Sequence, residues 1–480
     1  MKYLLCCYGL RATTMHLNDE LSLSSPKPSV PAVISSGGPW WRELNRYHWF
    51  VFVVASLGWL FDTMDQQLFN LSRAPAMADL LTEPPGSDAV KLWSGIATTI
   101  FMIGWATGGI IFGVVGDRMG RARTMVLTIL LYSMFTGLSA LSVGVWDFAL
   151  YRFLTGLGVG GEFAVGVALV AEVMPDRARP HALGLLQALS AVGNVMAALI
   201  GMILGEMKTA GLIETPWRMM FVVGVLPAIL AVVVMRRLKE PQRWAQTAAA
   251  EKAKQRLGSY AELFGDPRWR RNAIVGLLLA SSGVIGLWGI GFFSFELIGA
   301  VFRETFQKQG LASGAIDGKV AFWVGITSLL LNGGAFFGIY AFSRVTAVMG
   351  RKPAFALSFV LAMLTTAFTF AYLKVFSDVF WMIPLMGFCQ LALFGGYAIY
   401  FPELFPTRLR STGTSFCYNV GRYIASIGPL TLGLLASEVF GRYGKVESWR
   451  YAGVTMCAFF LLGLLALPFA PETKGQPLPE

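Results

Sequence analysis

The stretch EVMPDRAR, Glu172 to Arg179, returns 231 residues later as ELFPTRLR, Glu403 to Arg410. Other landmarks keep this spacing to within one residue: Asp147 with Asp378, Trp217 with Trp449, and Met119 with Met349. A near-constant offset over most of the chain indicates two related halves. Whatever fold the first half has, the second half should repeat it.

Both halves are strongly apolar. The chain has 480 residues, of which 55% are hydrophobic and 14% charged, and its mean hydropathy is +0.58. A soluble domain carries about 25% charged residues. The long continuous apolar runs lack the alternation of a membrane barrel, so the spanning elements must be helices. The composition predicts a polytopic membrane protein whose surroundings are a lipid bilayer.

Twelve apolar windows are long enough to cross a bilayer, six in each half. They lie near residues 49–71, 91–115, 124–143, 148–171, 182–206, 217–235, 272–299, 320–342, 353–373, 379–401, 412–437 and 451–469. We therefore expect an all-α fold of twelve transmembrane helices in two pseudo-symmetric six-helix bundles. Duplicated halves of this kind are typical of alternating-access transporters, with the substrate site between the halves at mid-membrane.

Most of the 39 Lys and Arg residues fall in loops and tails on one side of these spans. By the positive-inside rule, that side is cytoplasmic and holds both termini. The same rule accounts for the net charge of +11 without a nucleic-acid partner. The predicted organisation is a largely disordered tail, a first bundle, a cytoplasmic connection, a second bundle and a short cytoplasmic tail, at residues 1–48, 49–236, 237–271, 272–470 and 471–480.

Several motifs resemble those of the major facilitator superfamily. GVVGDRMGRAR, Gly113 to Arg123, matches the family's loop pattern G-x-x-x-D-R-x-G-R, and RFLTGLGVGGE, Arg152 to Glu162, is similar to its fourth-span pattern. PETKGQPLPE, Pro471 to Glu480, resembles the ending of sugar porters and organic-ion carriers. GGEFAVGVALVAE, Gly160 to Glu172, is nearest to sialate and monocarboxylate proton symporters, and two aspartates in the first span are similar to those of aromatic-acid proton symporters. The resemblance implies a secondary transporter.

The resemblance also implies a charged gate, because the family's loop helps to hold the cytoplasmic side shut. Asp117 falls opposite Ala347 when the halves are aligned, so the two halves should close unequally. The residues carried over to the gate are Asp117, Arg118, Arg121 and Glu172 in the first half, and Arg351, Glu403 and Arg408 in the second.

Four ionisable residues stand within the first and fourth spans: Asp62, Asp65, Arg152 and Glu162. An aspartate there costs about 2.5–3.5 kcal/mol, and such residues usually mark a transport pathway. Asp62 and Asp65 share a helix face, where repulsion and desolvation favour a proton on one of them. We therefore assign the proton to Asp62 or Asp65, and coupling to Arg152 with Glu162. The alternative is that one aspartate only neutralises Arg152.

Arg422 is the residue most informative about the substrate. It lies about ten residues into the eleventh span, too deep to reach the interface easily, and its planar guanidinium matches a carboxylate. The alternative is a permanent ion pair with an aspartate of the first span. Further candidate substrate residues are the amides and aromatics Gln187, Asn194, Trp288, Asn332, Gln390, Tyr397 and Asn419.

The sequence favours a proton-coupled symporter of a small organic anion, acting as a monomer in a bacterial cytoplasmic membrane. A sugar or polyol transporter and a non-transporting membrane sensor are the alternatives. Gly156, Gly158 and Gly161 fit a dinucleotide-binding pattern, but they lie in an apolar span, where small residues serve helix packing. We expect no cofactor, no metal and no enzymatic activity, since the spans carry no metalloprotease or serine-nucleophile motif.

Overall fold

The computed structural model describes residues 38–84, 87–251, 257–291, 294–311, 313–425, 431–432 and 434–480. The predicted tail at 1–37 therefore lies outside the described residues. Trp40–Glu480 form one compact unit. Its first helix begins earlier than the apolar pattern indicated, at Arg46, because the Asn45 side chain accepts the His48 N–H and caps it.

Residues 40–237, the first half, form a short η1 turn and the helices that follow it. These are η1 (Trp40–Glu43), α1 (Arg46–Leu81), α2 (Asp88–Met119), α3 (Arg121–Ser139), α4 (Val145–Val173), α5 (Arg179–Thr209), α6 (Pro216–Val223) and α7 (Pro227–Arg237). The sixth predicted span is thus split into α6 and α7. Pro227 starts the second piece, since proline suits the first turn of a helix but lacks the N–H to continue one.

The connection between the halves is itself helical, with α8 (Gln242–Glu251) and α9 (Tyr260–Gly265). The second half, residues 267–480, then forms α10 (Pro267–Val284), η3 (Ile285–Ile290), α11 (Ser294–Lys308), α12 (Ser313–Met349), α13 (Arg351–Tyr372), η5 (Phe376–Asp378), α14 (Val379–Leu404), η6 (Thr407–Leu409), α15 (Arg410–Ser415), η7 (Phe416–Val420), α16 (Gly421–Ala425), η8 (Leu435–Val439), η9 (Gly441–Tyr443), α18 (Lys445–Met456), α19 (Phe459–Ala466) and η10 (Leu467–Phe469).

Four predicted spans depart from a long apolar helix. Within the described residues, eight helices are long and apolar enough to cross a membrane. The remaining spans are α1, with its buried aspartates, and the three interrupted ones, α6–α7, α10–α11 and α15–α16. The last two contain π-helical turns, at η3 and η7. Such turns occur frequently at functional sites.

The packing of the first half is repeated in the second. α4 lies against α2 and α3, and α14 lies against their counterparts α12 and α13. The α2–α4 crossing is close because it is built on glycine: a Cβ on Gly156 or Gly160 would meet the backbone of α2. These glycines serve helix packing.

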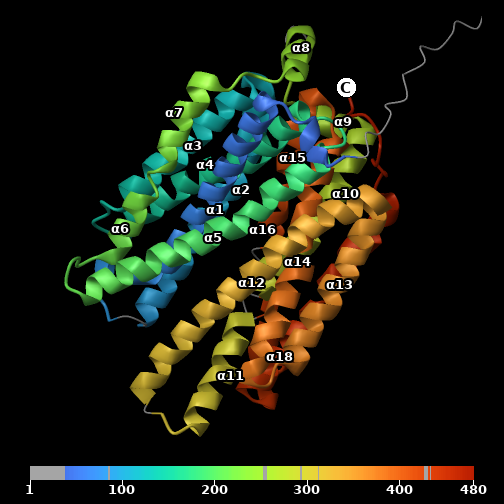
Figure 1. Ribbon diagram of the computed structural model, residues 1–480. Coiled ribbons are helices and arrows are strands. Elements are labelled where there is room, and N and C mark those ends of the chain that lie inside the picture. The colour runs from blue at the N-terminus through green and yellow to red at the C-terminus, as the bar shows by residue number, and fades with distance from the viewer. Residues whose placement is uncertain are drawn as a thin grey trace, which may run out of the picture. The chain divides into compact units, whose positions relative to one another are not determined.

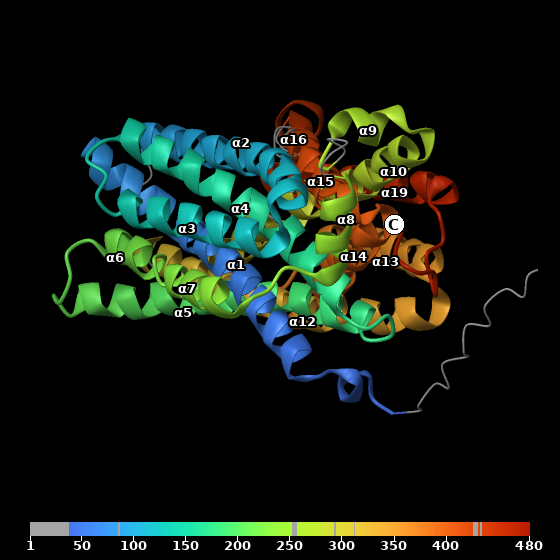
Figure 2. The same ribbon diagram turned by 90° about the horizontal axis from the view of Figure 1, so that it is seen from above.

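The two halves meet along two helix pairs. α5 of the first half runs beside α12 of the second, as Figure 1 and Figure 2 both show, and α2 contacts α15. Gly184 on α5 approaches Ser343 on α12, and Gly113 on α2 approaches Ser415 on α15, so closely that a Cβ on either glycine would press on the serine side chain. Both contacts lie toward the end of the unit that holds α8 and α9, which we call the α8–α9 end.

Each half also has a turn fastened by a glutamate, which we call a clasp. Gly120 between α2 and α3 has φ +108°, a conformation that favours glycine. The Glu240 carboxylate accepts the N–H groups of Ala122 and Arg123, both at 3.1 Å. The free N–H groups at a helix start attract an anion. The connection after α7 is thereby tied to the start of α3.

The second clasp repeats the first about 230 residues later. Gly350 has φ +96°, and Glu472 accepts the N–H groups of Arg351 at 2.9 Å and Lys352 at 3.0 Å. Burial alone would raise the pKa of Glu472, but these donors and the Lys474 N–H hold it below its usual value. The segment 471–480, predicted as a short tail, is thus packed onto the second half.

Candidate functional site

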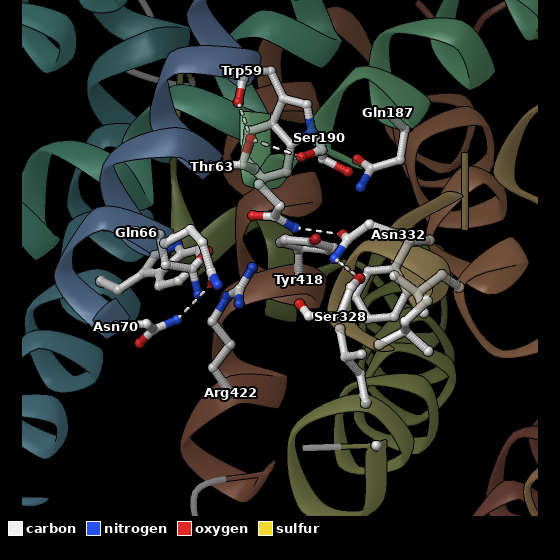
Figure 3. Close-up of a pocket in the computed structure, with 18 of the residues that line it drawn as sticks. Trp59, Thr63, Gln66, Asn70, Gln187, Ser190, Ser328, Asn332, Tyr418 and Arg422 are labelled. Atoms are coloured by element: carbon white, nitrogen blue, oxygen red, sulfur yellow. Dashed lines mark hydrogen bonds between the residues drawn. The ribbon is translucent and has the colours of Figure 1, made fainter. Parts of the chain in front are cut away.

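A cavity of about 130 Å³ lies between the two halves (Figure 3). The first half lines it with residues from α1, α2 and α5, namely Trp59, Thr63, Gln66, Gln67, Asn70, Trp105, Gln187, Ser190 and Asn194. The second half contributes Leu287, Gly291, Phe295, Ser328, Leu331, Asn332, Leu391, Phe394, Tyr418 and Arg422. The cavity is therefore apolar and aromatic in part, with many amides and one charged side chain among the described lining residues.

Arg422 is the charged side chain of this cavity. It is 3% exposed, and its guanidinium carbon lies 3.7 Å from the centre of the Trp105 ring and 4.6 Å from that of Tyr418. Such stacking stabilises a buried cation. Its Nε and Nη1 atoms have no hydrogen-bond partner, and no ion pair of Arg422 is found among the described residues. The alternative of a permanent pair with a first-span aspartate is not what the structure shows.

Trp105 was not predicted as a site residue. The chain has 14 tryptophans, and only the crossing of α2 with the eleventh span puts this one under Arg422. The polar stripe of α1 was missed as well, although its signal was available. Thr63, Gln66, Gln67 and Asn70 recur at the three- and four-residue spacing of one helix face, directly beside the predicted aspartates.

Three predicted amides do line the cavity, and two of them connect the halves. The Asn194 side chain on α5 donates to Oδ1 of Asn332 on α12 at 2.9 Å, and Asn332 donates to the Ser328 carbonyl at 2.9 Å (Figure 3). Gln187, the third, has its side-chain oxygen unpartnered. These groups form an uncharged polar wall that can donate and accept hydrogen bonds.

The remaining predicted substrate residues lie elsewhere. Asn419 donates to the Ser415 carbonyl at 3.2 Å and toward the Gly160 carbonyl at 3.4 Å, so it bridges helices. Gln390 donates to the Gly286 carbonyl at 2.8 Å, and the Tyr397 hydroxyl donates to the Leu279 carbonyl at 2.7 Å. None of the three is part of the cavity lining. The side chain of Trp288 lies outside the described residues.

The structure distinguishes the two aspartates of α1. Asp65 accepts the Thr136 hydroxyl at 2.7 Å, and its other oxygen is 3.9 Å from Nη1 of Arg152. Arg152 also donates to the Ser139 hydroxyl and lies 4.6 Å from the centre of the Phe221 ring. Asp65 is therefore the aspartate that neutralises Arg152.

Asp62 has no such partner. It is 1% exposed, and neither carboxylate oxygen has a hydrogen-bond partner among the described residues. The charged side chains that act on it are Glu162, Asp65 and Arg422. Asp62 is therefore a buried acid without a partner, under the electrostatic influence of the acids of the first half and of the cavity arginine.

Glu162, on α4, is a further buried acid of the first half. Its Oε2 accepts the Thr128 hydroxyl at 2.8 Å, while Oε1 has no partner. That oxygen faces Gly58, one helical turn before Asp62, because a Cβ on Gly58 would collide with it. Glu162 and Arg152, ten residues apart on α4, have different partners, so they do not pair with each other.

The residues predicted for the gate in the first half reach across to the second. Asp117 pairs with Arg121 at 2.8 Å and accepts the Ser411 N–H at 3.1 Å and the Thr412 N–H at 2.8 Å. Arg121 donates to Glu172 at 2.8 Å and to the Thr407 carbonyl at 2.7 Å. All three of these charged side chains are buried.

The second half adds one charged side chain to this network. Its other buried ion pair joins two residues of the second half. Arg410 pairs with Glu172 at 2.8 Å. Arg351 pairs with Glu403 at 2.7 Å within the second half, where Glu403 also accepts the Thr473 hydroxyl. The halves thus contribute unequally at the α8–α9 end.

Two predicted gate arginines bind the connection between the halves. Arg408 pairs with Glu262 of α9 at 2.7 Å, and Arg118 donates to the Leu257 carbonyl at 3.1 Å.

Known proteins match this chain along most of its length. The family model described as sugar (and other) transporter matches residues 46–267. A putative metabolite transport protein of Haemophilus influenzae is 28% identical, covering 91% of this chain and 99% of its own. A probable 4-methylmuconolactone transporter of Cupriavidus pinatubonensis and a cis,cis-muconate transport protein of Acinetobacter baylyi are each 27% identical, covering 91% of this chain and 93% and 97% of their own.

The fold matches a solved structure of the major facilitator superfamily. The proton:xylose symporter XylE superposes with a TM-score of 0.69 at 18% identity, covering 90% of this chain and 98% of its own. The predicted all-α fold of twelve helices is confirmed by this likeness. Together with the duplicated helix packing and the matching relatives, it shows a multi-pass membrane protein with the major facilitator fold, similar in sequence to transporters.

Proposed function

We propose that this protein carries a small organic anion together with protons by alternating access, as a monomer in a bacterial cytoplasmic membrane. The α8–α9 end and both termini face the cytoplasm, so the structure is closed on that side. The names of two relatives support an organic anion in general, since muconate is a dicarboxylate and methylmuconolactone a monocarboxylate.

Arg422 is the observation that carries this proposal. A buried guanidinium with unpartnered nitrogens is costly unless an anion completes it. The substrate carboxylate would occupy that place, in a cavity reached from both halves. A substrate bound there would contact both Arg422 of the second half and the α1 and α5 walls of the first. Contacts with both halves would favour closure of the two halves around the substrate.

Asp62 is the proposed proton carrier. Its buried carboxylate has neither an ion pair nor a hydrogen bond among the described residues, and in such surroundings the neutral acid is the tolerated form. Because Arg422 acts on Asp62 electrostatically, a carboxylate arriving at Arg422 would cancel the charge that favours an ionised Asp62. Substrate binding would thereby retain the proton. Glu162 and the Arg152–Asp65 pair provide the other ionisable groups near Asp62.

A sugar or polyol transporter is the second candidate, favoured by the amide wall of the cavity. Purified protein in liposomes with an internal pH-sensitive dye distinguishes the two. Added carboxylates, and not neutral sugars, should acidify the lumen in proportion to uptake. Acidification by sugars with no response to carboxylates would replace the organic-anion proposal.

The gate proposal makes a prediction for Asp117→Asn. The variant loses the charge that pairs with Arg121, and its amide group would oppose the Thr412 N–H that Asp117 now accepts. The cytoplasmic side should open more often. Maleimide labelling of a Ser343→Cys reporter, buried against Gly184, should become several-fold faster.

The matched control is Asp266→Asn. Asp266 is exposed at the same end and caps α10, a role that asparagine performs equally well. Its labelling rate should equal that of the reporter alone. Equal rates for Asp117→Asn and the control, with normal transport, would remove Asp117 from the gate.

A further inference from the structure

We infer that the cavity selects a monocarboxylate whose planar body ends in an uncharged polar group, and that it discriminates against dicarboxylates. The inference rests on the proposed function and specifies its substrate. It predicts that, of two molecules of the same shape, the protein binds the one with the smaller negative charge more tightly. The relatives' names do not give this preference.

The charge inventory of the cavity is the first argument. Arg422 is its single charged side chain among the described lining residues. Residues 292–293 and 426–430, which the structure does not describe, contain no Lys or Arg in the sequence. One guanidinium matches one carboxylate. A second carboxylate on the same ligand would enter the cavity without a cation.

The first half makes a second negative charge more costly still. Asp62 and Glu162 are buried behind the α1 wall, and neither forms an ion pair among the described residues. Arg152 is already committed to Asp65. The added anion would therefore find no uncommitted cation beside it among the described residues of the first half, and a buried charge without a partner is costly.

The chemistry of the wall away from Arg422 is the third argument. Asn194 and Asn332 come from α5 and α12, and Figure 3 shows Asn332 and Arg422 at different sides of the cavity. An amide both donates and accepts, so this pair can bind a carbonyl, a hydroxyl or an amide by exchanging its own hydrogen bond. A carboxylate at this wall could accept hydrogen bonds from the two amides, but it would find no positive charge there.

The shape of the cavity completes the ligand. Its volume of about 130 Å³ is close to that of an engineered cavity of about 150 Å³ that holds benzene. Trp59, Phe295, Phe394 and Tyr418 provide aromatic walls, and flat walls favour a flat ligand. A single ring or a short conjugated chain is of the size that such a cavity holds.

Two pairs of probes test the charge preference without changing shape. Terephthalate and 4-carbamoylbenzoate differ at one end only, where a carboxylate replaces an amide, and fumarate and its monoamide form a smaller pair. Binding to the purified full-length protein is measured by calorimetry at pH 7.5. We expect the monoanion of at least one pair to bind at least tenfold tighter than its dianion.

A variant should reverse this preference. Asn332→Lys adds a cation at the amide wall, and Asn332→Met removes the same hydrogen bond with no charge. Relative to the methionine variant, the lysine variant should shift the dianion-to-monoanion affinity ratio at least tenfold toward the dianion. Elution as a monodisperse peak in size-exclusion chromatography establishes that each variant is folded.

The outcomes separate the inference from the proposed function. Dianions that bind wild type as tightly as their monoanions would overturn the inference and leave the organic-anion proposal standing. A lysine variant with the same ratio as the methionine variant would also overturn it. If none of the four carboxylates binds, the proposed function fails, and the inference fails with it.

Discussion

Uptake of a carboxylate into proteoliposomes is expected to fall at least about 25-fold when Arg422 is replaced by Gln. Removing one member of a buried charge pair costs about 2–5 kcal/mol, and 1.4 kcal/mol corresponds to a factor of ten. Glutamine offers the substrate neither the charge nor the fork of the guanidinium. The initial rate of radiolabelled uptake, at equal amounts of reconstituted protein, measures the effect.

Arg422→Lys divides this loss into two parts. Lysine keeps the positive charge but loses the planar fork and the stack on Trp105. It should therefore bind more weakly than wild type and better than the glutamine variant. Arg442→Gln, at an exposed arginine of η9, is the control and should transport normally. Normal uptake by Arg422→Gln would remove the organic-anion proposal and advance the sugar alternative.

The second large effect concerns coupling, where Asp62→Asn should abolish uptake driven by a pH gradient. Asparagine imitates the protonated acid, so the variant can complete the loaded state but cannot release a proton afterwards. Exchange of labelled for unlabelled substrate at equal pH requires no net proton movement and should persist. Measuring both activities on one preparation separates coupling from substrate binding.

Asp65→Asn is the matched comparison, three residues along the same helix. Asp65 is held by Thr136 and faces Arg152, so its loss leaves a buried cation unpaired and should lower protein yield and overall rate. Its proton-to-substrate ratio should stay that of wild type. If both variants keep gradient-driven uptake with an unchanged ratio, the two aspartates are structural and Glu162 becomes the candidate proton carrier.

The fold was predictable because its signals are long and repeated. Apolar windows of about 20 residues and a near-constant offset between halves define twelve spans without any knowledge of contacts. The interruptions were less accessible. Pro227 announces the break between α6 and α7, whereas the π-helical turns at η3 and η7 have no comparable mark in the sequence.

The site could be predicted residue type by residue type, but not pair by pair. A buried charge is visible in an apolar run, which is how Arg422, Asp62 and Asp65 were selected. Which aspartate faces Arg152 depends on how α1 is rotated against α3 and α4. That rotation is set by packing, so sequence left the two equivalent where the structure separates them.

The two clasps have a consequence for how the protein is made. Glu240 lies 120 residues after Gly120 in the sequence, and Glu472 lies 122 residues after Gly350. At a synthesis rate of about 5–20 residues per second, each glutamate is made roughly 6–24 s after the glycine of its clasp. Glu240, which completes the first clasp, is therefore synthesised before most of the second half. Biogenesis would proceed as two assembly steps of nearly equal duration, each ending when its own glutamate arrives.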